Sequence, residues 1–237
     1  LTLVVGIRYD DLEQANSRKG YATLYDDSEV TTRLGASYAI SEEINIYASF
    51  AQAFLPQHRA IKNSDPKAET SDGIEFGVKG FVFDNRMSFQ TAIFTTKRKD
   101  VAVTDTEDPN FAVLAGEVDV QGIEFSSITE LTESLSLSFN AGYTDIEISE
   151  EDKLKGVGVP VFPEFTGSIY LNYEAQFGAL EGLAVSGGFR HIGESDNNIY
   201  TDKTWDGYNV ADINARYPVT ENISISLGIL NLTDKKY

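Results

Sequence analysis

The segment LSLSFNAGYTD, residues 135–145, decides the fold class of this chain. Its apolar residues occur at every second position, and the positions between them hold Ser, Asn, Gly and Thr. Because side chains alternate between the two faces of a β-strand, such a segment has one apolar face and one small, polar face. A strand of this kind fits a barrel wall with lipid outside and water or a plug inside.

The same alternation recurs along the chain. We count roughly eleven such segments of about 9–13 residues, which is the length that a tilted strand needs to cross a bilayer. Strands of soluble proteins usually have only about 5–6 residues. The clearest further examples lie near residues 2–9, 44–50, 74–79, 211–217 and 223–229.

A soluble antiparallel sandwich is the main alternative, because its strands also alternate. The outward face of a sandwich favours Lys, Glu and Thr, whereas the polar positions here are rich in Ser, Gly and Asn and carry few charges. Strand length and face chemistry together therefore favour an all-β fold, an antiparallel transmembrane barrel.

Composition excludes several classes of protein. The 237 residues suffice for one large domain or two small ones. The absence of cysteine excludes disulfides and thiolate metal sites. No run approaches the roughly 18 apolar residues of a membrane-spanning helix. The net charge of −18 argues against nucleic acid as a partner, since phosphate is repelled.

The connections between the expected strands alternate strictly between long and short. The long ones are acidic, which serves solubility or, alternatively, recruits or bridges cations at a cell surface. In outer-membrane barrels long loops are extracellular and short turns periplasmic, so the first and last strands are expected to run outward. The long connections are expected at 10–29, 55–69, 99–117, 148–162 and 194–206, and the short ones near 41–43, 84–85, 132–134, 176–181 and 218–222.

Five short motifs carry a family resemblance. They are YASFAQAF (47–54), GIEFGVK (73–79), VQGIEF (120–125), GGFRHIG (187–193) and NLTDKKY (231–237). In this order and spacing they resemble the barrel of TonB-dependent siderophore receptors. Each motif alone is weak, but the ordered set spans most of the chain and is fairly specific.

The resemblance implies a 22-stranded barrel of which residues 1–237 form the C-terminal half, roughly strands eleven to twenty-one. The plug domain and the TonB box of such receptors are then expected to lie outside this chain. Eleven strands alone cannot close a barrel, and lipid does not tolerate the unpaired backbone groups of open edges. We therefore expect the chain to be part of a longer protein.

The resemblance also implies a function: TonB-energised uptake of a ferric siderophore through the outer membrane of a Gram-negative bacterium. Its partners are then the siderophore, the TonB complex through the missing N-terminal part, and outer-membrane lipid. Aromatic and polar groups at the upper strand ends and loops are expected to bind the ligand. The candidates are Phe54, Gln57, Phe111, Tyr200 and Trp205, and Trp205 is equally well explained as a girdle aromatic.

Three alternatives to this function remain open. A passive porin-like barrel would lack the plug and the TonB box. A TonB-dependent receptor could instead take up haem, vitamin B12 or a glycan, because loop sequence does not decide the ligand. A soluble β-rich binding domain would remain soluble without detergent.

No catalytic or metal-binding motif is found, and we expect neither an enzyme nor a resident cofactor. The two histidines, His58 and His191, are far apart in the sequence. Residues 105–108 are acidic but lack the Gly and the terminal Glu of a calcium loop. His58 and Arg59 could contact an anionic ligand, although an ordinary exposed loop pair is the simpler interpretation.

Two glutamates, Glu75 and Glu124, fall on the polar faces of their strands. A catalytic pair of carboxylates is one possible interpretation. We favour a structural one, in which they are lumen-facing partners of Lys79, of Arg33 or of plug residues.

Overall fold

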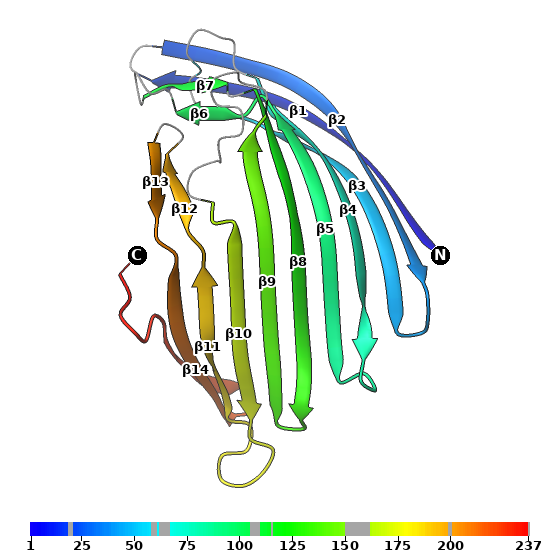
Figure 1. Cartoon of the computed structure of the whole chain (residues 1–237), viewed down its shortest axis with the longest axis vertical. Helices are drawn as coiled ribbons and strands as arrows, with labels where there is room; N and C mark the ends of the chain where they lie inside the picture. Colours follow the sequence, from blue (N-terminus) through cyan, green and yellow to red (C-terminus); the bar gives the residue numbers. More distant parts are fainter. Residues whose placement is uncertain are drawn as a thin grey trace.

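The computed structural model describes residues 1–18, 21–57, 61, 67–104, 110–114, 116–149, 162–198 and 201–236. Within them, one antiparallel sheet of eleven strands follows the order of the sequence (Figure 1). No helix among the described residues is long and apolar enough to span a membrane. The strands of the sheet are β1 (Thr2–Arg18), β2 (Tyr21–Ala39), β3 (Ile44–Leu55), β4 (Glu69–Val82), β5 (Met87–Lys99), β8 (Glu117–Thr132), β9 (Leu135–Ile148), β10 (Phe165–Glu174), β11 (Ala184–Ile192), β14 (Tyr208–Thr220) and β15 (Ile223–Ile229).

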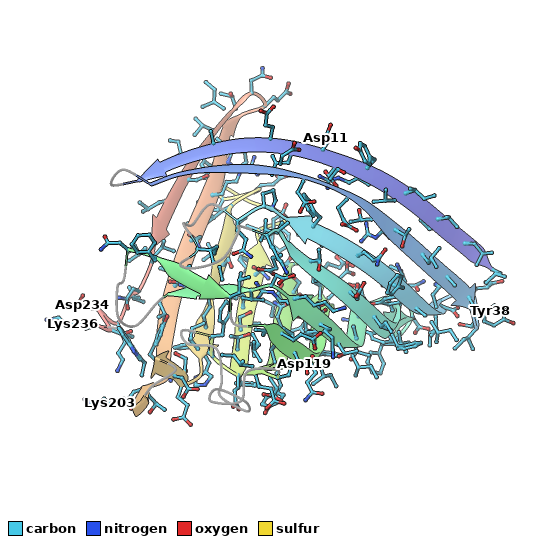
Figure 2. All side chains as sticks on the ribbon, turned by 90° about the horizontal axis from the view of Figure 1, so that it is seen from above. Asp11, Tyr38, Asp119, Lys203, Asp234 and Lys236 are labelled. Carbon is cyan, nitrogen blue, oxygen red and sulfur yellow. The ribbon has the colours of Figure 1, made fainter. Side chains whose placement is uncertain are left out.

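Two small hairpins lie at the upper ends of these strands. The first pairs β6 (Ala102–Thr104) with β7 (Ala112–Leu114), and the second pairs β12 (Ser195–Asn198) with β13 (Thr201–Trp205). Seen from above, the large sheet curves round, so that the strands carrying Asp11 and Asp119 form different parts of its wall (Figure 2). This architecture confirms the expected all-β, antiparallel fold.

The register places the apolar positions of neighbouring strands side by side on one face, the outer face. Phe76 of β4 pairs with Ile93 of β5, which pairs with Ile123 of β8, which in turn pairs with Tyr143 of β9. These side chains are exposed, as is Leu227 of β15 with 68% of its surface accessible. Large apolar side chains in an unbroken exposed band fit contact with lipid.

The polarity of the two faces is reversed at the upper ends of β8 and β9. On the outer face the apolar band gives way to Asp119 and Glu147, which are paired across the two strands. On the opposite face Val118 and Ile148 are completely buried, and they pack against Val101. Charged groups outside and an apolar core inside are the pattern of a strand surrounded by water, so these strands extend beyond the apolar band.

The turn between β4 and β5 has the backbone geometry of a tight hairpin. Phe83, Asp84 and Asn85 all have positive φ, between 56° and 66°, and the Arg86 amide donates to the Phe83 carbonyl at 3.1 Å. Asp and Asn tolerate this left-handed region better than other residues with a side chain, and it suits the twist of a hairpin. The expected turn at 84–85 is therefore confirmed.

Four of the expected connections need correction. The expected loop at 10–29 is mostly strand, because β1 and β2 remain paired up to Arg18 and Tyr21. The connections 99–117 and 194–206 each contain a hairpin. The expected turn at 218–222 is shorter, since β14 continues to Thr220 across a bulge. In each case a backbone ladder continues although the apolar alternation that marks the bilayer has stopped.

Candidate functional site

One polar site lies on the lumen face, by which we mean the face opposite the apolar band. The Tyr47 hydroxyl accepts a hydrogen bond from Gln90 Nε2 at 3.1 Å, and Glu75 lies near it on the same face. Lys79 Nζ lies 5.6 Å from the centroid of the Tyr47 ring, within the range of a cation–π interaction. Glu124 of β8 is exposed on the same face. Tyr47 thus joins three neighbouring strands into one polar site that contains two carboxylates.

The two carboxylates do not pair with the expected cations of this chain. Within the described residues, no ion pair joins Glu75 or Glu124 to Lys79 or Arg33. Glu75 and Lys79 are four residues apart on one strand, which separates their Cα atoms by about 13 Å. The expectation of an internal pair is therefore wrong, and the part of the expectation that concerns plug residues stays a prediction.

A second polar cluster surrounds Asp212, whose side chain is buried although it lies on the lumen face. Arg190 Nε and the Tyr170 hydroxyl each donate to Asp212 Oδ2 at 2.8 Å. The backbone amide of Asn231 donates to Asp212 Oδ1 at 2.9 Å. Asp212 thereby connects β10, β11, β14 and the segment that follows β15. Hydrogen bonds to an ionised carboxylate are the stronger kind, so we expect this cluster to contribute to stability.

The segment after β15 forms a tight turn around Asn231. The Asn231 side chain accepts a hydrogen bond from the Lys235 amide and donates one to the Lys235 carbonyl, both at 2.9 Å. Asn231 has a φ of 52°, which Asn tolerates better than most residues. The motif at 231–237 is thus linked through Asp212 to Arg190 of the motif at 187–193, although the sequence separates them by a strand pair and a hairpin.

Aromatic rings lie across glycines of neighbouring strands at three places on the lumen face. A Cβ at Gly77 would overlap the ring of Tyr47, and one at Gly122 would come within 2.6 Å of the Phe94 ring. A third such contact places Tyr170 over Gly188. Each of these glycines belongs to one of the five motifs. A ring that lies across a missing side chain stays close to the wall and leaves the lumen free.

The two polar sites are joined by a groove of about 340 Å³ on the lumen face. One row across the strands runs from Ser126 through Asn140 and Ser168 to Arg190. Asn140 Nδ2 donates to Ser168 Oγ at 3.2 Å. Glu124 lines the end of the groove on β8, and Arg190 lines the end on β11. The groove therefore has a negative and a positive end with small polar residues between them.

The expected ligand residues lie in different environments. Gln57 is buried, and its Nε2 donates to the Asp100 carbonyl. Phe111 is half-buried directly before β7, and a parallel bridge between Ile61 and Ala112 links that hairpin to the connection after β3. Gln57 and Phe111 are therefore associated with one corner of the upper rim.

The other expected ligand residues lie elsewhere. Trp205 ends β13, opposite Ser195, and 55% of its surface is exposed. Phe54 pairs with Thr70 on the outer face, the face of Phe50, which suits a girdle aromatic better than a ligand contact. Tyr200 lies outside the described residues. None of the five assignments is tested by this arrangement, and each stays a prediction.

Other residues singled out from the sequence also lie outside the described part of the chain. They are His58, Arg59 and the acidic stretch at 105–108. Sequence reasoning missed Asp212 as the centre of a cluster. Its only signal was an acidic residue on a strand face otherwise occupied by Val, Asn and Arg.

The curved wall, the apolar outer band and the polar lumen face are matched in known proteins. The family described as TonB dependent receptor-like, beta-barrel matches residues 1–232. This chain belongs to that family. Barrels of TonB-dependent receptors are proteins of the Gram-negative outer membrane, so the outer face is the lipid face.

Relatives of this TonB-dependent receptor barrel are transport receptors. The metal-pseudopaline receptor of Pseudomonas aeruginosa is 28% identical over 248 residues, which cover 99% of this chain and 35% of the relative. The ferrichrome outer membrane transporter/phage receptor of Escherichia coli is 26% identical over 242 residues, which cover 99% of this chain and 32% of the relative. The chain thus spans about a third of the length of these relatives.

Solved structures show the same fold. The siderophore receptor PiuA of Acinetobacter baumannii superposes with a TM-score of 0.76 at 24% identity, over 98% of this chain and 36% of that one. The ferric yersiniabactin uptake receptor of Yersinia pestis also gives a TM-score of 0.76, at 20% identity, over 98% of this chain and 38% of that one.

Proposed function

We propose that the full-length protein is an outer-membrane receptor that takes up a ferric siderophore, energised through TonB. The observation that carries this proposal is the match of residues 1–232 to the TonB-dependent receptor barrel family. Relatives named as receptors for ferrichrome, ferrioxamine B and pyoverdine support a ferric siderophore as the transported ligand. The iron chelate is cargo, and no resident cofactor and no catalytic residue is proposed.

This segment contributes the barrel wall and part of the extracellular rim. The connections and hairpins beyond the polarity reversal of β8 and β9 would face the medium, where a chelate arrives. Gln57, Phe111, Tyr200 and Trp205 are the residues that we propose for contact with it, and Phe54 is retained only as a weaker candidate. Aromatic side chains can cover the apolar surface of a chelate while losing little rotamer freedom.

The lumen face contributes the contact with the domain that fills the barrel. Glu124 is exposed there and Glu75 is half-buried. Neither forms an ion pair within the described part of the chain, and they would accept cationic side chains of that domain. Contact with the TonB complex would be made by the part of the receptor outside this chain, and contact with lipid by the outer face.

Direct binding to the purified full-length receptor tests the ligand assignment. Quenching of intrinsic fluorescence is measured with a panel of ferric hydroxamate, catecholate and mixed siderophores, and with haem, vitamin B12 and oligosaccharides. We expect saturable binding of at least one ferric siderophore at submicromolar concentration, about −8 kcal/mol or stronger. Saturable binding confined to haem, vitamin B12 or a glycan would replace the siderophore by that ligand.

A further inference from the structure

The orientation of Arg190 sets it apart among the cations of the lumen face. Its Nε is fixed by Asp212, which also holds Tyr170. Nevertheless 45% of the Arg190 side chain is exposed, whereas Asp212 is only 3% exposed. A guanidinium carries five N–H donors, so the bond from Nε leaves the four donors on the two Nη atoms. Arg190 is therefore a cation held in position by the buried Asp212 while it lines an open groove.

The surroundings of Arg190 in the groove are small and polar. Ser168 is its cross-strand partner, and Asn140 and Ser126 continue the same row. Glu124 lies three strands away, which corresponds to about 14 Å at a strand spacing of about 4.8 Å. The two ends are thus too far apart to neutralise each other directly. Arg190 already forms an ion pair with Asp212 through Nε, so a further group of opposite charge would contact its Nη atoms.

We propose that Arg190 is a docking point for a carboxylate side chain of the receptor's own lumen-filling domain. This rests on the proposed function, which places such a domain inside the barrel. A carboxylate is the group that matches the planar guanidinium best, and the small residues Ser126 and Ser168 leave room for a protein chain along the groove. The acidic end at Glu124 and the basic end at Arg190 together fix the register of the docked segment. Asp212 and Tyr170 serve as positioning residues that hold the guanidinium in place.

Zero-length cross-linking tests this contact in the full-length receptor in outer membranes. The Arg190→Lys variant places an amine where a carbodiimide can join it to a neighbouring carboxylate. We expect a cross-link from position 190 to one Asp or Glu of the lumen-filling domain, identified by mass spectrometry. The control is Arg216→Lys, which places an amine on the lumen face outside the groove. The yield of the cross-link to that Asp or Glu should be about tenfold or more higher in Arg190→Lys than in the control. Cross-links only to Asp212 or Glu124 would overturn the proposal. If Arg190→Lys does not fold, Ser168→Lys on the same row replaces it.

A second measurement uses loss of the contact. In Arg190→Gln, protease should cleave the lumen-filling domain about tenfold faster than in the wild type, whereas Arg216→Gln should leave the rate unchanged. An unchanged rate in Arg190→Gln would overturn the proposal. So would weaker ferric siderophore binding at an unchanged cleavage rate, because Arg190 would then serve the ligand. The cross-link yield and the cleavage rate are both measured without a ligand. Failure of the wild type to bind any ferric siderophore would therefore contradict only the proposed function.

Discussion

The Tyr47 ring lies across Gly77 of the neighbouring strand, in the space that a side chain at position 77 would occupy. This contact keeps the ring close to the wall and directs its hydroxyl to Gln90. The glycine of the motif at 73–79 is therefore required by its neighbour and not by its own backbone conformation, since its φ is not positive.

Gly77→Ala should displace the Tyr47 ring toward the lumen and lower the free energy of unfolding by about 1–3 kcal/mol, as overpacking does. Gly35→Ala is the matched control, because its new Cβ would make only ordinary contacts, the nearest at 3.7 Å from Val4 Cβ. Urea unfolding in lipid vesicles measures both variants. In the double variant with Tyr47→Ala the penalty should largely disappear, and strictly additive penalties would show that the ring is not the cause.

Asp212→Ala should lower the free energy of unfolding by about 2–3 kcal/mol, because it removes the carboxylate that accepts hydrogen bonds from three donors. The loss is no larger because Arg190 remains accessible to water. Tyr170→Phe removes one hydrogen bond and should cost about 1 kcal/mol. The control is Tyr217→Phe, whose hydroxyl makes only a 3.4 Å exposed contact with the Ala179 carbonyl. Equal stability of Asp212→Ala and the control would refute a stabilising role of the cluster.

Leu137→Arg should destabilise the receptor by about 2–4 kcal/mol if it lies near the bilayer midplane, because Leu137 pairs with Leu171 on the lipid face. Ser138→Arg should cost much less, since Ser138 lies on the lumen face and accepts a hydrogen bond from Asn172 Nδ2 at 3.1 Å. Folding from detergent into bilayers compares the two variants. Similar losses in both would contradict the assignment of faces.

Epitope tags test the orientation of the sheet. A tag at Asp108, in the connection between β6 and β7, should be reached by antibody on intact cells. A tag at Asn85, in the turn between β4 and β5, should be reached only after the outer membrane is permeabilised. The reverse pattern of labelling would invert the topology.

The double change Tyr200→Ala and Trp205→Ala should weaken binding of the ferric siderophore by more than about tenfold, because one good aromatic anchor is typically worth about 2 kcal/mol. The barrel should stay folded, since neither residue belongs to a strand of the eleven-stranded sheet. Fluorescence and heat-modifiability on gels measure the two effects. Unchanged affinity in a folded double variant would remove both residues from the site.

Period-two alternation predicted the eleven strands because burial against lipid on one face acts on every second residue. It failed above the bilayer. There the charged Asp119 lies on the outer face and the apolar Val118 on the lumen face, the reverse of the arrangement in the bilayer. In addition, β6 pairs with β7 and β12 with β13 without an apolar band to mark them. Backbone pairing needs no amphipathic pattern, so these hairpins could not be read from hydrophobicity.

The candidate site was predictable only in part. The faces of Glu75 and Glu124 follow from alternation, but the distance to Lys79 excludes the expected internal pair. The Asp212 cluster depends on the register between several neighbouring strands. Alternation shows which face each residue is on, but it does not show which residues of neighbouring strands are paired. The sequence contains the motif glycines, but their role emerges only when Tyr47 and Tyr170 are seen lying across them.

Uptake of radioactive iron tests TonB-energised transport by the full-length receptor. Cells that lack their own siderophore receptors and express the full-length protein are given the ferric siderophore that it binds, with and without an intact TonB system. We expect saturable uptake that is lost when TonB is removed or the proton gradient is dissipated. Uptake that continues unchanged without TonB, or that never saturates, would contradict energised transport and favour a passive barrel.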